Sequence, residues 1–286
     1  MMDTRQQGRS AALLLPPRHL LLLKRFLLLL LLPWHLLLAV LNKYAHSLGL
    51  STQWNFMDVF SLDKELLDML PKPVACLLFI YPITEKSEAA PIGEKLPAST
   101  EGVYFMKQTV SNACGTVALL HAIANKRDQL QIEKDSTLDK FFAKTKDSTP
   151  EERAKIMETD EVQSRLKFIA KLLSSGASGS VSGGVGGARR RDATGLNTAH
   201  ESAATEGQTS APDRESRTNL HYIALLNRGG KILEFDGRRD GPVSHGDTNE
   251  SNFLADSATV VQKFMARQSD DLNFSIVALA KGESPF

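Results

Sequence analysis

Apolar residues from about residue 42 onward fall into short blocks whose spacing predicts alternating helices and strands. Val74–Tyr81 (VACLLFIY) is a continuous apolar run of strand length that ends at Pro82, which predicts a buried strand. Apolar residues recur with helical spacing in six other segments, namely Lys43–Leu50, Leu62–Leu70, a segment opening at Asn112 with Val117, Leu120 and Ala124 on one apolar face, Leu138–Lys144, Glu151–Glu161 and Asn252–Ala266. This alternation predicts an α/β fold.

The C-terminal half adds a predicted hairpin. Leu220–Leu226 and Lys231–Asp236 have strand character and flank Arg228-Gly229-Gly230, which is a hairpin signal. Val103–Met106 and Phe274–Leu279 are predicted as further strands, and the polar, proline-containing segment Glu85–Thr100 as a loop.

The N-terminal segment differs from the rest because leucine dominates it. A membrane helix needs about 20 apolar residues, and the longest candidate, Phe26–Leu41, is shorter and contains Pro33 and His35. A membrane or targeting segment, a signal-peptide core and low-complexity sequence from a misassigned start all stay open. We therefore treat 1–39 as a separate atypical segment and 40–286 as one globular domain.

A second atypical segment interrupts that domain. Ser174–Arg191 (SSGASGSVSGGVGGARRR) has the glycine and serine content of a linker, and polar residues continue to Asn219. Loops of this length in a domain usually reflect function, a boundary or disorder.

Charge and cysteine content exclude several classes of protein. The 286 residues include 34 Lys plus Arg and 33 Asp plus Glu, a net charge of +1, which argues against nucleic acid as a partner. The two cysteines, Cys76 and Cys114, provide neither a disulfide framework nor a cysteine-rich zinc site, and they indicate a reducing compartment.

Cys114 is the candidate nucleophile because it stands at a predicted helix start. A helix N-terminus has unpaired N–H groups and partial positive charge, which stabilise a thiolate and can bind an oxyanion. Gln108, six residues upstream, offers a further donor, and Gly115 leaves room for a substrate backbone. The alternative is a small buried hydrophobic residue, which is our interpretation of Cys76.

A thiolate nucleophile needs a base, and seven histidines are available. His121 follows Cys114 on the same helix, His200 and His245 fall in predicted loops, and His221 opens the first strand of the hairpin.

Hairpin arithmetic brings His221 close to a carboxylate. With Arg228-Gly229 as a two-residue loop, His221 faces Asp236 directly. With Gly229-Gly230 as the loop, Asp236 faces Ile223 and His221 is its diagonal neighbour on the same face. A three-residue loop would break this parity unless a bulge restored it. Either two-residue register is compatible with a Cys/His/Asp set.

Three segments together resemble the ubiquitin carboxyl-terminal hydrolase family of papain-like cysteine peptidases, in its short single-domain form. They are YFMKQTVSNACGTVALLHAIAN (Tyr104–Asn125), EGQTSAP (Glu206–Pro212) and LHYIALLNRGGKILEFDGRRDGP (Leu220–Pro242). The likeness extends from about Val40 to Leu279, apart from one insertion at about 166–197.

The resemblance implies a role for each of five residues. Cys114 is the nucleophile, His221 the base and proton donor, Asp236 the carboxylate that orients it, and Gln108 the oxyanion donor. Asp58 matches an acidic position that holds the basic tail of ubiquitin; the alternative is a helix-capping aspartate before the Leu62 helix.

The resemblance also implies a fold and an activity. The fold is a mostly antiparallel six-stranded sheet flanked by helices, with a knotted backbone and a loop crossing over the cleft. The activity is hydrolysis of amides, esters and small adducts at the C-terminal glycine of ubiquitin or a close ubiquitin-like modifier. The enzyme needs no cofactor or metal, acts as a monomer in the cytoplasm, with the nucleus as a second location, and binds neither nucleic acid nor membrane.

Two departures from the family pattern leave alternatives open. Trp34–Ala39 stands where the family has an acidic segment, so a ubiquitin-binding protein with impaired catalysis is the alternative function. A membrane-anchored adaptor is suggested only by the leucine-rich leader. The insertion at 166–197 lies in the crossover loop, where it either widens the passage for bulky conjugates or is a gene-model artefact.

Overall fold

The computed structural model describes residues 38–39, 41–89, 91–111, 113–160, 162, 220–267 and 274–283. The leucine-rich leader up to residue 37 and the predicted insertion at 166–197 lie outside the described residues. Residues 41–47 are helical. The other elements, in chain order, are β1 (Trp54–Asp58), α2 (Lys64–Asp68), β2 (Val74–Pro82), α3 (Glu85–Ala89), β3 (Glu94–Lys95), α4 (Cys114–Asn125), α5 (Arg127–Leu130), α6 (Thr137–Thr145), α7 (Pro150–Thr159), β4 (Leu220–Arg228), β5 (Lys231–Phe235), β6 (Val243–Asp247), α10 (Phe253–Ala266) and β7 (Ser275–Lys281).

The described strands form one sheet in the order β1-β7-β2-β4-β5-β6-β3, and each neighbouring pair is antiparallel. The predicted class, an α/β fold with a mostly antiparallel sheet flanked by helices, is confirmed. The sheet has seven strands, not six, because the two-residue strand β3 pairs with the outer side of β6. The segment Glu85–Thr100, predicted as a loop, therefore contains both α3 and β3.

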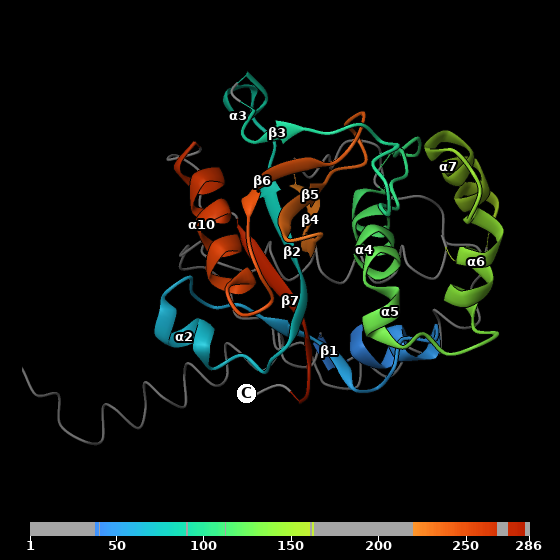
Figure 1. Ribbon diagram of the computed structural model, residues 1–286, viewed down its shortest axis with the longest axis horizontal. Coiled ribbons are helices and arrows are strands. Elements are labelled where there is room, and N and C mark those ends of the chain that lie inside the picture. Colours follow the sequence, from blue (N-terminus) through green and yellow to red (C-terminus); the bar gives the residue numbers. More distant parts are fainter. Residues whose placement is uncertain are drawn as a thin grey trace, which may run out of the picture.

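Helices cover both faces of the sheet, with α4 on one side and α10 on the other (Figure 1). Because helices cover the centre of the sheet on both of its faces, every residue of β2 is buried, as the apolar run predicted. The prediction of a single apolar face on α4 is wrong. This helix is buried almost all round, with only Cys114 and Ala124 partly exposed.

The strand predicted at Val103–Met106 does not form. Side chains of α4 pair with its backbone where a neighbouring strand would do so: the Tyr104 N–H donates to Asn125 Oδ1 at 2.8 Å, and the Met106 N–H donates to His121 Nε2 at 3.0 Å. The segment is therefore extended, but it is bound to helices.

Three of the described strands, β1, β3 and β6, were not predicted from the sequence. All three are short and contain polar residues, so none of them forms the continuous apolar run that marks β2. His245, predicted in a loop, lies on β6. Within the described part of the chain, no helix is both long and apolar enough to cross a membrane.

Candidate active site

Cys114 is the first residue of α4, and its thiol is partly exposed. The residue before it, Ala113, caps the helix without a side-chain hydrogen bond, because a methyl group cannot accept one. The N–H groups of the first turn are therefore not satisfied by a capping side chain, and their partial positive charge lies at the thiol.

His221 and Asp236 form a buried pair. The imidazole Nε2 lies 2.8 Å from the Asp236 Oδ1 atom, and the two side chains are only 3% and 2% exposed. In the hairpin, Arg228 pairs with Lys231 and Ala224 with Phe235, so Gly229-Gly230 form the loop. The second of the two predicted registers is therefore the one observed, with His221 diagonal to the carboxylate.

The imidazole of His221 lies between this carboxylate and the thiol. Burial disfavours its charged form, but hydrogen bonds to Asp236 and Cys114, together with their charges, outweigh burial and raise the pKa of His221 to about 9. Because a carboxylate only accepts hydrogen bonds, Nε2 carries the proton that points to Asp236. Nδ1 is then the nitrogen available to the thiol.

Asp236 stays ionised despite its burial. Burial raises the pKa of this carboxyl group, yet the hydrogen bond and charge of His221, together with the backbone N–H and the charge of Arg238, lower it overall. The Arg238 N–H donates to Oδ1 at 2.9 Å, so the same oxygen that accepts from the imidazole is fixed by the turn that follows β5.

Gln108 is hydrogen-bonded to the turn that follows β5. Its backbone N–H donates to the Gly237 carbonyl at 2.8 Å, and its side-chain Nε2 donates to the Val110 carbonyl at 3.2 Å. Gly237 also packs against Val117 in the first turn of α4. The segment carrying Gln108, the turn carrying Asp236 and the helix carrying Cys114 therefore meet at this glycine.

Gly237→Ala is expected to disturb all three segments at once. An added Cβ would lie 2.6 Å from Val117 Cγ1 and 3.0 Å from Gln108 Cβ, which is closer than real Cβ contacts. We expect a loss of about 1–3 kcal/mol in the free energy of unfolding and reduced turnover, because overpacking forces backbone shifts. Denaturant titration and steady-state rates measure these two effects.

The double variant Gly237→Ala/Val117→Ala is the matched control, because it removes the closest of these contacts. It should recover part of the lost turnover. Full turnover in Gly237→Ala alone would contradict this packing role of the glycine.

The remaining candidates from the sequence lie elsewhere. His121 is fully buried, and burial lowers its pKa to about 3, so it stays neutral beneath the site. Cys76 is fully buried in β2, and burial raises the pKa of its thiol to about 12, as expected for a structural cysteine. Asp58 ends β1 and does not cap the next helix, whose N-cap is Asp63.

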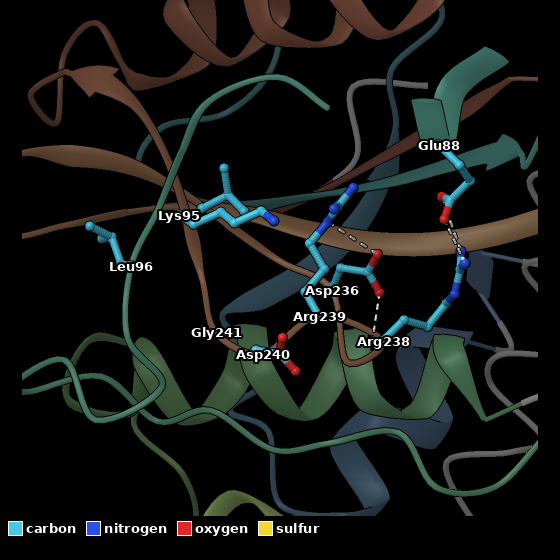
Figure 2. Close-up of a pocket in the computed structure, with 9 residues that line it drawn as sticks. Glu88, Lys95, Leu96, Asp236, Arg238, Arg239, Asp240 and Gly241 are labelled. Atoms are coloured by element: carbon cyan, nitrogen blue, oxygen red, sulfur yellow. Dashed lines mark hydrogen bonds and ion pairs between the residues drawn. The ribbon is translucent and has the colours of Figure 1, made fainter. Parts of the chain in front are cut away.

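Three ionisable residues connected to Asp236 were not predicted from the sequence. Arg239 lies 3.8 Å from Asp236, Glu234 lies 3.7 Å from Arg239, and His245 hydrogen-bonds to Glu234. Of these, Arg239 lines a pocket of about 260 Å³ together with Glu88 of α3, Lys95 of β3 and the turn at 236–241 (Figure 2). Sequence reasoning missed them because no motif links β5 to its neighbour β6. Among the described residues, no three His, Cys, Asp or Glu side chains are grouped as a metal site would require.

Comparison with known proteins gives one consistent family. Residues 38–183 and 184–266 match the model of ubiquitin carboxyl-terminal hydrolase, family 1. A ubiquitin carboxyl-terminal hydrolase of Aplysia californica is 38% identical over 81% of this chain and 92% of its own length. The human ubiquitin carboxyl-terminal hydrolase isozyme L1 is 34% identical over 85% of this chain and 94% of its own.

A solved structure has a similar fold. The Trichinella spiralis UCH37 catalytic domain bound to ubiquitin vinyl methyl ester matches with a TM-score of 0.60, covering 85% of this chain and 92% of that one, at 16% identity.

Proposed function

The chain belongs to family 1 of the ubiquitin carboxyl-terminal hydrolases, which are cysteine-type deubiquitinating enzymes, and from this premise we propose how it acts. It hydrolyses amide, ester and small peptide adducts at the C-terminal glycine of ubiquitin, or of a close ubiquitin-like modifier. Cys114, His221 and Asp236 carry the reaction.

The observation that carries this assignment is the placement of His221. One ring nitrogen is held by Asp236 at 2.8 Å, and the imidazole also interacts with Cys114. A base within reach of a thiol, and itself oriented by a carboxylate, is the arrangement that nucleophilic catalysis requires.

The reaction follows from this arrangement. The thiol proton of Cys114 passes to His221 Nδ1 before the attack, because the raised pKa of the imidazole favours the imidazolium. The sulfur then attacks the glycine carbonyl, and the oxyanion accepts hydrogen bonds from Gln108 and the first N–H groups of α4. The imidazolium then gives its proton to the leaving amine or alcohol, which leaves a thioester on Cys114. Water attacks the thioester with His221 as base, releasing the ubiquitin carboxylate and the free thiol.

Further proposals concern substrate and setting. Asp58 binds the basic tail of ubiquitin, since an acidic side chain suits that partner. The enzyme works as a monomer in the cytoplasm, with the nucleus as a second location, without cofactor or metal. It needs no nucleic acid or membrane.

Hydrolysis of ubiquitin carrying a C-terminal fluorogenic amide tests the proposed activity. We expect release of the fluorophore by the purified full chain, and no release from a fluorogenic peptide that carries only the last residues of ubiquitin, because binding to the folded domain positions the tail. Failure to cleave the ubiquitin amide, or equal cleavage of the short peptide, would contradict the proposal.

A further inference from the structure

A second buried histidine–carboxylate pair lies next to the first. His245 on β6 donates from Nε2 to Glu234 Oε2 on β5 at 2.7 Å, and these two side chains are 4% and 2% exposed. Glu234 precedes Asp236 by two residues, so both carboxylates lie on the same face of the chain. Two buried carboxylates are thus neighbours at the end of β5.

Arg239 lies between them. Its Nε atom is 3.7 Å from Glu234 Oε1 and 3.8 Å from Asp236 Oδ2. The second oxygen of each carboxylate accepts a hydrogen bond from a histidine. Asp236 Oδ1 accepts from His221, and Glu234 Oε2 accepts from His245. Figure 2 shows the Arg239 side chain extended beside Asp236, on the side away from the Arg238–Glu88 pair.

Without a cation between them, two buried carboxylates this close cannot both remain ionised at low cost. Like charges in a site of low dielectric raise the pKa of one partner, which then takes up a proton. A protonated Asp236 offers His221 no negative charge, so the imidazolium would lose its stabilising partner.

We propose that Arg239 is a positioning residue of this active site, whose guanidinium separates the two buried carboxylates and so keeps Asp236 ionised and paired with His221. Glu234, which is itself fixed by His245, faces the guanidinium from β5 at 3.7 Å. The inference rests on the proposed roles of Cys114, His221 and Asp236.

Other charged groups also act on the two carboxylates. The charge of Arg238 contributes to the lowered pKa of Asp236, whereas Arg239 is the cation placed between Asp236 and Glu234. Arg238 is paired with Glu88 of α3 through its Nη2 atom at 2.9 Å. Burial and the negative charges of Glu234 and Asp236 raise the pKa of the Tyr81 hydroxyl on β2, which shows that their field extends across the sheet. Further charges are Lys95 on β3 and Asp240, which line the same pocket, and Arg267 after α10.

Arg239→Met tests the proposal because methionine keeps the length of the side chain and removes its charge. We expect kcat/KM at pH 7 to fall by about tenfold, a size typical of coupling between contacting charges. The loss should be larger at pH 6 than at pH 8.5, because the acid limb of the pH profile moves to higher pH when Asp236 takes up a proton more easily. Arg239→Lys should restore part of the rate.

The double variant Arg239→Met/Glu234→Gln separates charge from packing. With Glu234 neutral, Asp236 no longer faces a like charge, so the double variant should be faster than Arg239→Met alone. If Arg239 has only a structural role, the losses of the single variants Arg239→Met and Glu234→Gln should add in the double variant. Lys95→Met, which removes another cation of the same pocket, is the matched control and should leave the pH profile unchanged.

The rate of Cys114 alkylation by iodoacetamide against pH gives a readout that needs no ubiquitin substrate. If this profile shifts in Arg239→Met and returns in the double variant, the inference holds even where ubiquitin amides are not cleaved. An unshifted profile in Arg239→Met, or additive losses in the double variant, would overturn it.

Discussion

Cys114→Ala is expected to abolish hydrolysis of ubiquitin C-terminal esters and amides while binding of ubiquitin survives. The thiol is the group that bonds to the glycine carbonyl, so its loss should cost about four orders of magnitude or more in turnover. The substitution removes one sulfur atom from a partly exposed position at a helix start, where alanine is tolerated. Turnover and ubiquitin affinity are measured on the same preparation.

Cys76→Ala is the matched control for this experiment. That thiol is fully buried in β2, and no step of the proposed reaction uses it. Turnover should therefore remain near the unmodified rate, apart from a loss of stability caused by the small cavity. Substantial turnover in Cys114→Ala would show that Cys114 is not the nucleophile.

Asp236→Asn is expected to have the second largest effect, a fall of about 10⁴-fold in turnover, as found when the orienting carboxylate of a catalytic triad becomes an amide. The amide keeps the shape of the side chain but can present its NH₂ group to His221 Nε2. The ring would then place its proton on Nδ1, the nitrogen that must accept the thiol proton.

The same substitution should change the pH profile. Asp236 helps to hold the pKa of His221 at about 9, so the wild-type imidazolium persists up to that pH and is lost above it. Without the carboxylate charge the pKa of His221 falls, and the alkaline limb of residual kcat/KM or of thiol alkylation should move to lower pH.

Asp240→Asn is the control, because Asp240 belongs to the same turn and its side chain is exposed beside Lys107. It should leave the profile of thiol alkylation unchanged. An unchanged pH profile of thiol alkylation in Asp236→Asn would mean that Asp236 does not influence the pKa of His221.

The pairing of His221 with Asp236 could be predicted because it depends on local rules. Hairpin loops of two residues fix the register, and side chains in strands alternate between faces, so only two arrangements were possible. The structure has the one with Gly229-Gly230 in the loop. Buried β2 could be predicted for a similar reason, since a continuous apolar run needs cover on both faces.

Other features depend on contacts between distant parts of the chain, which a sequence pattern does not record. The extended segment at Tyr104 and Met106 has the composition of a strand, but α4 side chains satisfy its backbone. Glu234 and Arg239 meet because the turn after β5 folds back, and His245 reaches Glu234 because β5 pairs with β6. The predicted knot and the role of Asp58 in binding the ubiquitin tail stay predictions.

Reaction of the full chain with an electrophilic probe at the C-terminus of ubiquitin tests the central claim most directly. We expect one adduct, located on Cys114 by peptide mass spectrometry, with Cys76 unmodified, since burial raises the pKa of that thiol to about 12. An adduct on another residue, or tight binding of ubiquitin with no adduct, would contradict the claim; the latter result would indicate a ubiquitin-binding protein without catalytic function.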